Sequence, residues 1–252
     1  MKIAVCIKQV VTREWQLRVN DQKTWIRDQD ASFELNEPDA YALEEALRLK
    51  EKHTGEVIVC CAGPARAGQV IREALARGAD RAIHVESDAL ASADANAVAE
   101  ALAAAIKEES VDLVLTGLQS DDQGFGQVGV ILAEKLGMPH ATIIMEVQKT
   151  DAGLSVKREL EGGWFQWVGL PMPALLTIQS GINQLRYATL KGIMAAKKKE
   201  IKKVTPAAVS PAQRIASIYF PEKGKKTQML PGSAAEAAKE LVKRLREEAR
   251  AL

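Results

Sequence analysis

The chain has 252 residues, of which 47% are hydrophobic and 27% charged, so it can bury a full core in one or two domains. Lys and Arg total 34 against 33 Asp and Glu, which leaves no net field to attract nucleic acid or an anionic membrane surface. Three cysteines do not make a disulfide framework, and no apolar run reaches the ~20 residues of a membrane span. We therefore expect a cytoplasmic protein without nucleic-acid partners or membrane insertion.

The first part of the chain alternates apolar runs with helical patterns, which is typical of a mainly parallel sheet covered by helices. Strands are expected at 3–10, 57–61, 82–85, 111–115 and 141–147. Helices are expected from Asn36 through Leu49 and at 69–77, 93–109 and 126–136. Asn36 suits a helix N-cap and Gly78 a helix end. The predicted fold class is doubly wound α/β.

The pattern changes after residue 150. Short strands at 155–159 and 165–168 flank residues 161–163 and predict a β-hairpin, and a buried strand follows at 174–178. Four prolines then punctuate an extended arm, and a helix at 233–252 opens with a capping box of Ser233 and Glu236. We divide the chain into an α/β domain, 1–190, and a C-terminal part, 191–252. The arm has little core of its own, so we expect it to dock on a partner chain, with packing on its own domain as the alternative.

A glycine-rich loop follows the fourth strand, from Gly117 to Gly129. A strand, such a loop and a helix start form an anion site, because free backbone N–H groups and the helix dipole act at one point. Gly124, Gly126 and Gly129 fit G-x-G-x-x-G, but in the fourth unit rather than at the first strand's own turn, where a nicotinamide site would have them. We expect a nucleotide phosphate at the helix start. A glycine loop without a ligand remains the alternative.

Other residues at strand ends converge on the same region. Cys6, Asn36, Asp39 and Ala62 could reach one adenine-sized ligand, since ligands of open α/β sheets sit at the carboxyl ends of the strands. The three histidines have no neighbouring pattern of a triad or a metal site, so we expect neither catalytic residues nor a metal.

Several stretches resemble the β subunit of electron transfer flavoprotein. Asn36 with residues 42–51 is similar to that family's first helix, and residues 117–129 are similar to its nucleotide loop. Residues 156–168 followed by 173–177 satisfy the family's β-subunit signature at each defined position, and residues 186–190 are similar to its partner-recognition loop.

The resemblance implies a non-enzymatic electron carrier. The chain would form a heterodimer with an α subunit that holds most of the FAD, bind a structural AMP itself, and dock dehydrogenases that donate electrons. Carried over by position, the AMP contacts are Cys6, Asn36, Asp39, Ala62, Gly117, Gln119, Asp122, Gly124, Gly126, Gln127 and Val128. The docking residues are Arg186, Tyr187 and a protruding Leu190.

The nucleotide loop departs from the pattern of many AMP-binding members. Gly126 and Val128 stand where those members have Asn and Thr, so backbone amides must hold the phosphate. A bifurcating branch of the family binds a second FAD in place of AMP, and its loop also ends in Gln-Val-Gly, but with a small hydroxyl residue where Phe125 stands. We expect AMP, with a second FAD as the alternative.

Overall fold

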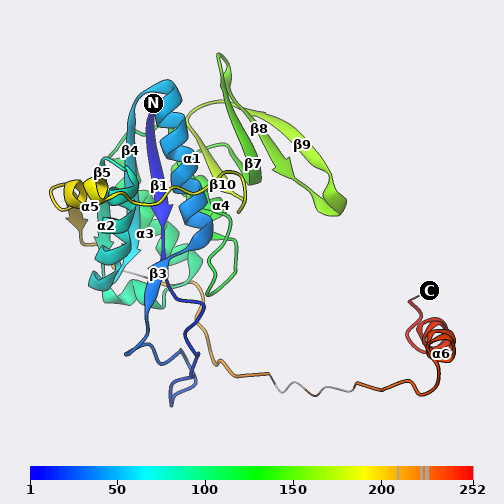
Figure 1. Ribbon diagram of the computed structural model, residues 1–252. Coiled ribbons are helices and arrows are strands. Elements are labelled where there is room, and N and C mark those ends of the chain that lie inside the picture. The colour runs from blue at the N-terminus through cyan, green and yellow to red at the C-terminus, as the bar shows by residue number, and fades with distance from the viewer. Residues whose placement is uncertain (209, 222–223, 225–226, 252) are drawn as a thin grey trace. The chain divides into compact units, whose positions relative to one another are not determined.

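The computed structural model describes residues 1–208, 210–221, 224 and 227–251, and within them nine strands form one central sheet (Figure 1). The strand order is β11-β5-β4-β1-β6-β10-β7-β8-β9; neighbours are parallel from β11 to β7, and β8 and β9 continue the sheet antiparallel. The strands are β1 (Lys2–Ile7), β4 (Glu56–Gly63), β5 (Arg81–Glu86), β6 (Leu113–Gly117), β7 (His140–Thr150), β8 (Gly153–Glu159), β9 (Phe165–Leu170), β10 (Ala174–Ile178) and β11 (Ile201–Val204). The mainly parallel sheet and the predicted hairpin are confirmed.

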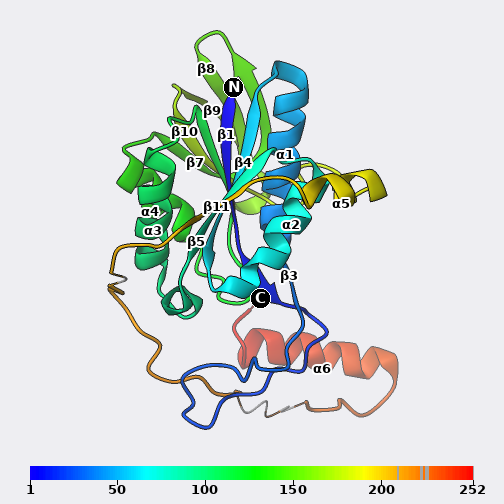
Figure 2. The ribbon, with the colours of Figure 1, turned by 90° about the vertical axis from the view of Figure 1, so that its left-hand side faces the viewer.

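Helices cover both faces of the parallel part of the sheet, as Figure 2 shows. One face packs against α1 (Glu37–His53) and α2 (Gly68–Arg77), and the other against α3 (Ala95–Lys107) and α4 (Val128–Leu136). Short 3₁₀ turns lie at Ala65–Ala67, Asp88–Ala91 and Glu161–Gly163. This arrangement confirms the doubly wound α/β class.

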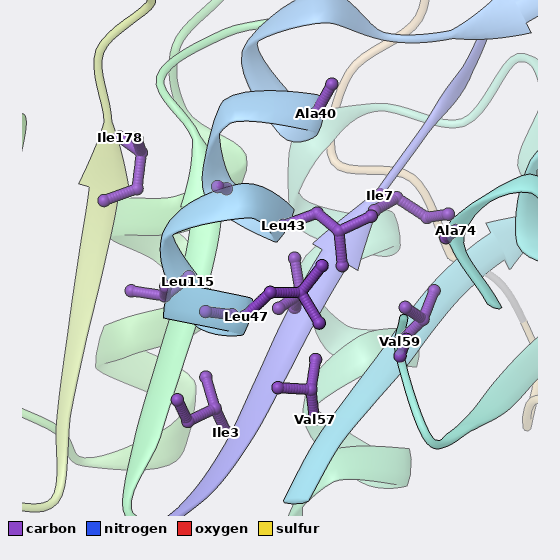
Figure 3. Close-up of a cluster of buried hydrophobic side chains, with 14 of the residues drawn as sticks. Ile3, Ile7, Ala40, Leu43, Leu47, Val57, Val59, Ala74, Leu115 and Ile178 are labelled. Atoms are coloured by element: carbon purple, nitrogen blue, oxygen red, sulfur yellow. The ribbon is translucent and has the colours of Figure 1, made fainter. Parts of the chain in front are cut away.

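Strand residues point alternately into two cores because successive side chains of a strand face opposite sides. Ile3 and Val5 belong to the core under α1 and α2, whereas Ala4 and Cys6 belong to the core under α3 and α4. Figure 3 shows Leu43 of α1 over the first of these cores. Each large apolar side chain buried this way contributes about 1.5–3 kcal/mol.

The order of strands in the sheet reverses beside β1. From β1 the chain builds outward through β4 and β5, then returns to place β6 on the other side of β1. In open α/β sheets a crevice forms at such a reversal, beyond the carboxyl ends of the strands. The fold therefore places a crevice beyond Ile7 and Gly117, the last residues of β1 and β6.

The strand predicted at 3–10 is two strands. β1 ends at Ile7, and β2 (Gln9–Val11) leaves the main sheet to pair antiparallel with β3 (Phe33–Leu35). The break falls at Lys8, whose backbone N–H donates to the carboxylate of Asp39 rather than to a neighbouring strand.

Two elements after residue 183 were not predicted. Helix α5 (Leu190–Ala196) packs on α2, and β11 pairs in parallel with β5 at the edge of the sheet. Only Ala196 among these residues is buried, so neither element buries a regular apolar face. Their sequences therefore lack the apolar periodicity from which an element can be predicted.

The chain separates into two compact units, Met1–Ile218 and Tyr219–Leu252. Within the first, the backbone N–H of Gln213 donates to the Asp94 carboxylate (2.8 Å) and that of Ile218 to the Lys23 carbonyl (2.7 Å). Our division at residue 190 concerns which part docks on a partner, and it stays a prediction.

The second unit is built around α6 (Ala234–Glu247). The capping box of Ser233 and Glu236 is confirmed, and Leu241 and Val242 are exposed on the helix. The helix predicted to run to residue 252 ends at Glu247. Residue 252 itself lies outside the described residues. No helix in the described part of the chain is long and apolar enough to cross a membrane.

Candidate functional site

A pocket lies at the carboxyl ends of β1, β4 and β6, where the strand order reverses. The structure brings nine of the predicted residues to its wall: Cys6, Asn36, Asp39, Ala62, Gly117, Gln119, Gly126, Gln127 and Val128. Asp122 lines the adjoining cavity instead, and Gly124 lines neither. Residues far apart in sequence thus form one site, while their binding of a nucleotide stays a prediction.

The carboxylate of Asp39 connects the strand ends under this pocket. Its Oδ2 accepts a hydrogen bond from the Lys8 backbone N–H (2.8 Å), and its Oδ1 accepts one from the Gly117 N–H (3.0 Å). Burial raises the pKa of Asp39 to about 7, and these two hydrogen bonds oppose the rise because they stabilise the charged form.

Asn36 holds the glycine-rich loop rather than its own helix. It stands at the N-cap position of α1, as predicted, but its side chain makes no capping bond. Instead its Oδ1 accepts the N–H of Asp121 (2.9 Å) and its Nδ2 donates to the carbonyl of Gln119 (3.1 Å). This pair of bonds fixes the loop beside the start of α1.

Lys8 is a site residue that the sequence analysis missed. Its Nζ forms an ion pair with Asp122 (2.7 Å) and hydrogen bonds with Ser120 (3.3 Å) and Gln123 (3.2 Å). Asp122 therefore holds the loop in place through Lys8. The signal available in the sequence was a lysine that interrupts the first apolar run.

Two glycines of the loop are required by close packing. A Cβ at Gly117 would lie 2.4 Å from Oδ1 of Asp39, and one at Gly129 would lie 2.6 Å from Cγ2 of Thr177 and 2.7 Å from Oγ1 of Thr116. Because Gly129 has no Cβ, the start of α4 can approach β6 and β10 closely.

The start of α4 supplies the chemistry of an anion site. Gln127 is its N-cap but makes no side-chain capping bond, which leaves the first N–H groups of the helix for another acceptor. Gln127, Val128 and Gly129 all line the pocket. The helix dipole adds a partial positive charge at the same point.

Two adjacent cysteines, Cys60 and Cys61, lie on β4 beside β1. Burial raises the pKa of Cys60 and of Cys61 to about 12, so both thiols stay protonated and unreactive. They lie in the two different cores, as their adjacent positions predict. No group of three His, Cys, Asp or Glu side chains in the described part of the chain could hold a metal ion.

A second cavity adjoins the pocket, and Phe125 lies on the boundary. Both share Lys8, Ala62, Leu90, Ala91, Gln123 and Phe125 as wall residues. The second cavity also has aromatic walls at Trp15, Trp25 and Phe33, and Arg66 stacks over the Phe33 ring at 4.5 Å.

Comparison with known proteins identifies the family. The family model described as the electron transfer flavoprotein domain matches residues 24–209. The chain belongs to the electron transfer flavoprotein family, as a β subunit. It is 37% identical to the electron transfer flavoprotein subunit beta of Methylophilus methylotrophus, with 98% of each chain covered. It is 35% identical to that of Bacillus subtilis over all of both chains, and 35% identical to that of Homo sapiens over 98% of this chain and 97% of the human one.

The segment predicted to dock partners of this electron transfer flavoprotein subunit lies away from the pocket, over α1 and α2. Tyr187 is 90% and Leu190 83% exposed. Arg186 instead pairs within the chain, with Glu44 (2.7 Å) and Glu51 (2.6 Å) of α1. Docking by these residues stays a prediction, and Arg186 serves to attach the segment to the fold.

The buried Asp39 carboxyl predicts an unusual pH dependence. Its pKa of about 7 exceeds its ordinary value of 3.8, so between these values the folded chain binds more protons than the unfolded chain and stability falls as pH rises. Compared with Asp39→Asn, which cannot titrate, the free energy of unfolding of the native chain should fall by up to about 4 kcal/mol from pH 4 to 7. Urea unfolding of both proteins across this range measures the difference. If the free energy of unfolding of the native chain does not fall with pH relative to that of Asp39→Asn, the pKa of Asp39 is not raised in the folded chain.

Proposed function

We propose that this chain is the AMP-holding half of a heterodimeric electron carrier. The observation that carries the proposal is the uncapped start of α4 at the wall of the pocket, where Gly129 allows close packing. A phosphate there would accept hydrogen bonds from free N–H groups. The adenosine part would lie against the strand ends, beside Cys6, Asn36 and Ala62.

The second part of the proposal is an α subunit that holds most of the FAD. A β subunit implies a partner, and the first unit offers an apolar surface on the hairpin that Figure 1 shows as β8 and β9. Its exposed side chains are Leu160, Trp164, Phe165 and Trp167. The exposed apolar residues of α6 supply a second surface for the same subunit.

The chain then carries electrons without a reaction of its own. We propose that dehydrogenases dock on Leu190 and reduce the flavin of the complex, in the cytoplasm.

A second candidate is the β subunit of a bifurcating flavoprotein, with a second FAD in place of AMP. The adjoining aromatic cavity favours it, because a dinucleotide could extend from the pocket across Phe125. AMP is the better proposal because the side chain of Phe125, on the boundary between the two spaces, would fill room that a second flavin needs.

The nucleotide content of the purified heterodimer tests the proposal directly. We expect denaturation to release one AMP and one FAD, identified by chromatography and mass. Gly129→Ala should lower the AMP content and leave FAD unchanged, since the added methyl displaces the start of α4. Gly169→Ala is the matched control, because a Cβ there meets nothing within 4 Å. Two FAD and no AMP would establish the bifurcating candidate instead.

Assembly with the α subunit should depend on the apolar side of α6. Leu241→Asp places a charge in the proposed interface and should weaken assembly at least tenfold, measured by titrating purified α subunit. Lys243→Asp, two residues along the same helix, is the control and should bind α normally. Equal binding by both variants would remove α6 from the interface.

Docking should depend on Leu190. We take a dehydrogenase that reduces the native complex and measure its KM for the complex as substrate. Leu190→Ala should raise this KM roughly thirtyfold, the effect of losing a hot spot of about 2 kcal/mol. Reduction by dithionite and AMP content should not change. The neighbouring exposed Lys191→Ala serves as the control. An unchanged KM for Leu190→Ala would place docking elsewhere.

A further inference from the structure

Helix α5 is too short to be stable on its own strength. It has seven residues, whereas isolated helices below about 12 residues are marginal in water. Among its side chains only Ala196 is buried, and Leu190, Ile193 and Met194 are exposed. Contacts with the rest of the fold must therefore hold it.

Arg72 of α2 holds the end of α5. Its Nη1 donates to the carbonyl of Ala196, the last residue of α5, at 2.6 Å, and to the carbonyl of Lys199 at 2.8 Å. The last carbonyls of a helix have no partner within it, and a cation there also complements the helix dipole.

Lys199 holds the end of α2 in return. Its Nζ donates to the carbonyl of Leu75 (3.0 Å) and to that of Ala79, on either side of the helix end at Arg77. Lys199 is thus half-buried, whereas the nearby Lys197, Lys198 and Lys202 are exposed. α2 thus contributes the cation at the end of α5, and the segment that follows α5 contributes the cation at the end of α2.

The two helices also touch backbone to backbone. A Cβ at Gly192 would lie 2.3 Å from the carbonyl oxygen of Ala76, so this approach needs glycine. Upstream, the ion pairs of Arg186 attach the preceding segment to α1. The exposed apolar side chains of α5 therefore stand on a backbone that is fixed on both sides.

We propose that Arg72 and Lys199 are positioning residues that fix α5 on α2 and so present Leu190 to the docking partner in one orientation. This inference rests on the proposed docking function. A rigid anchor binds more tightly than a mobile one because less conformational freedom is lost on binding.

Hydrogen exchange of the complete heterodimer tests the fixation itself. In Arg72→Ala, and likewise in Lys199→Met, amide exchange in residues 190–199 should accelerate about tenfold, as expected for the loss of charge-assisted hydrogen bonds. Arg72→Lys should restore part of the protection. Glu73→Ala is the control, since Glu73 pairs only with Arg77 of its own helix among the described ion pairs. Unchanged exchange in Arg72→Ala would overturn the proposal.

Electron uptake tests whether the fixation matters for docking. Arg72→Ala should raise the KM of a purified dehydrogenase for the flavoprotein complex, while the maximal rate and the AMP content stay unchanged. Faster exchange with an unchanged KM, while Leu190→Ala raises KM, would overturn the positioning role. If Leu190→Ala also leaves KM unchanged, the docking function fails and the presentation of Leu190 with it. The exchange rates then still decide whether the two cations hold α5.

Discussion

The carboxylate of Asp39 makes the contacts on which the pocket at the strand ends depends. It belongs to the first turn of α1, yet it receives the N–H of Lys8 after β1 and the N–H of Gly117 at the end of β6. One side chain thus joins the ends of two paired strands, just beyond their main-chain ladder, at the point where the strand order reverses. The loop after Gly117, its attachment to Asn36 and the start of α4 are all built outward from this junction. Glycine at 117 follows from the same contact, because a side chain would displace the carboxylate.

The elements of the fold that could be predicted are those whose signal is local. Apolar alternation and caps identified the parallel strands and α1 to α4, because each buries a regular face of its own sequence. The edge strand β11 and the short α5 could not be found this way. Their stability comes from partners distant in sequence, namely β5 for the strand and Arg72 for the helix. The break at Lys8 was missed for the same reason, since its cause is the carboxylate of Asp39.

The pocket residues were predictable as a set, because carboxyl ends of parallel strands meet at one edge. Their individual roles were less so. Asn36 has the identity of a helix cap, but its side chain bonds the loop. Asp122, whose contact with a ligand stays a prediction, pairs with Lys8. Such choices are between two hydrogen-bond partners of similar strength, and only the three-dimensional arrangement decides between them.

Helix α5 and the pocket lie at opposite ends of the parallel strands. α5 rests on the last turn of α2, near the start of β5, whereas the pocket lies beyond the ends of β1 and β6. The six residues of β1 separate these edges by roughly 20 Å. Substitutions at such a distance act additively on stability and binding. Evolution can therefore change the exposed surface of α5 residue by residue without disturbing the pocket at the other edge of the sheet.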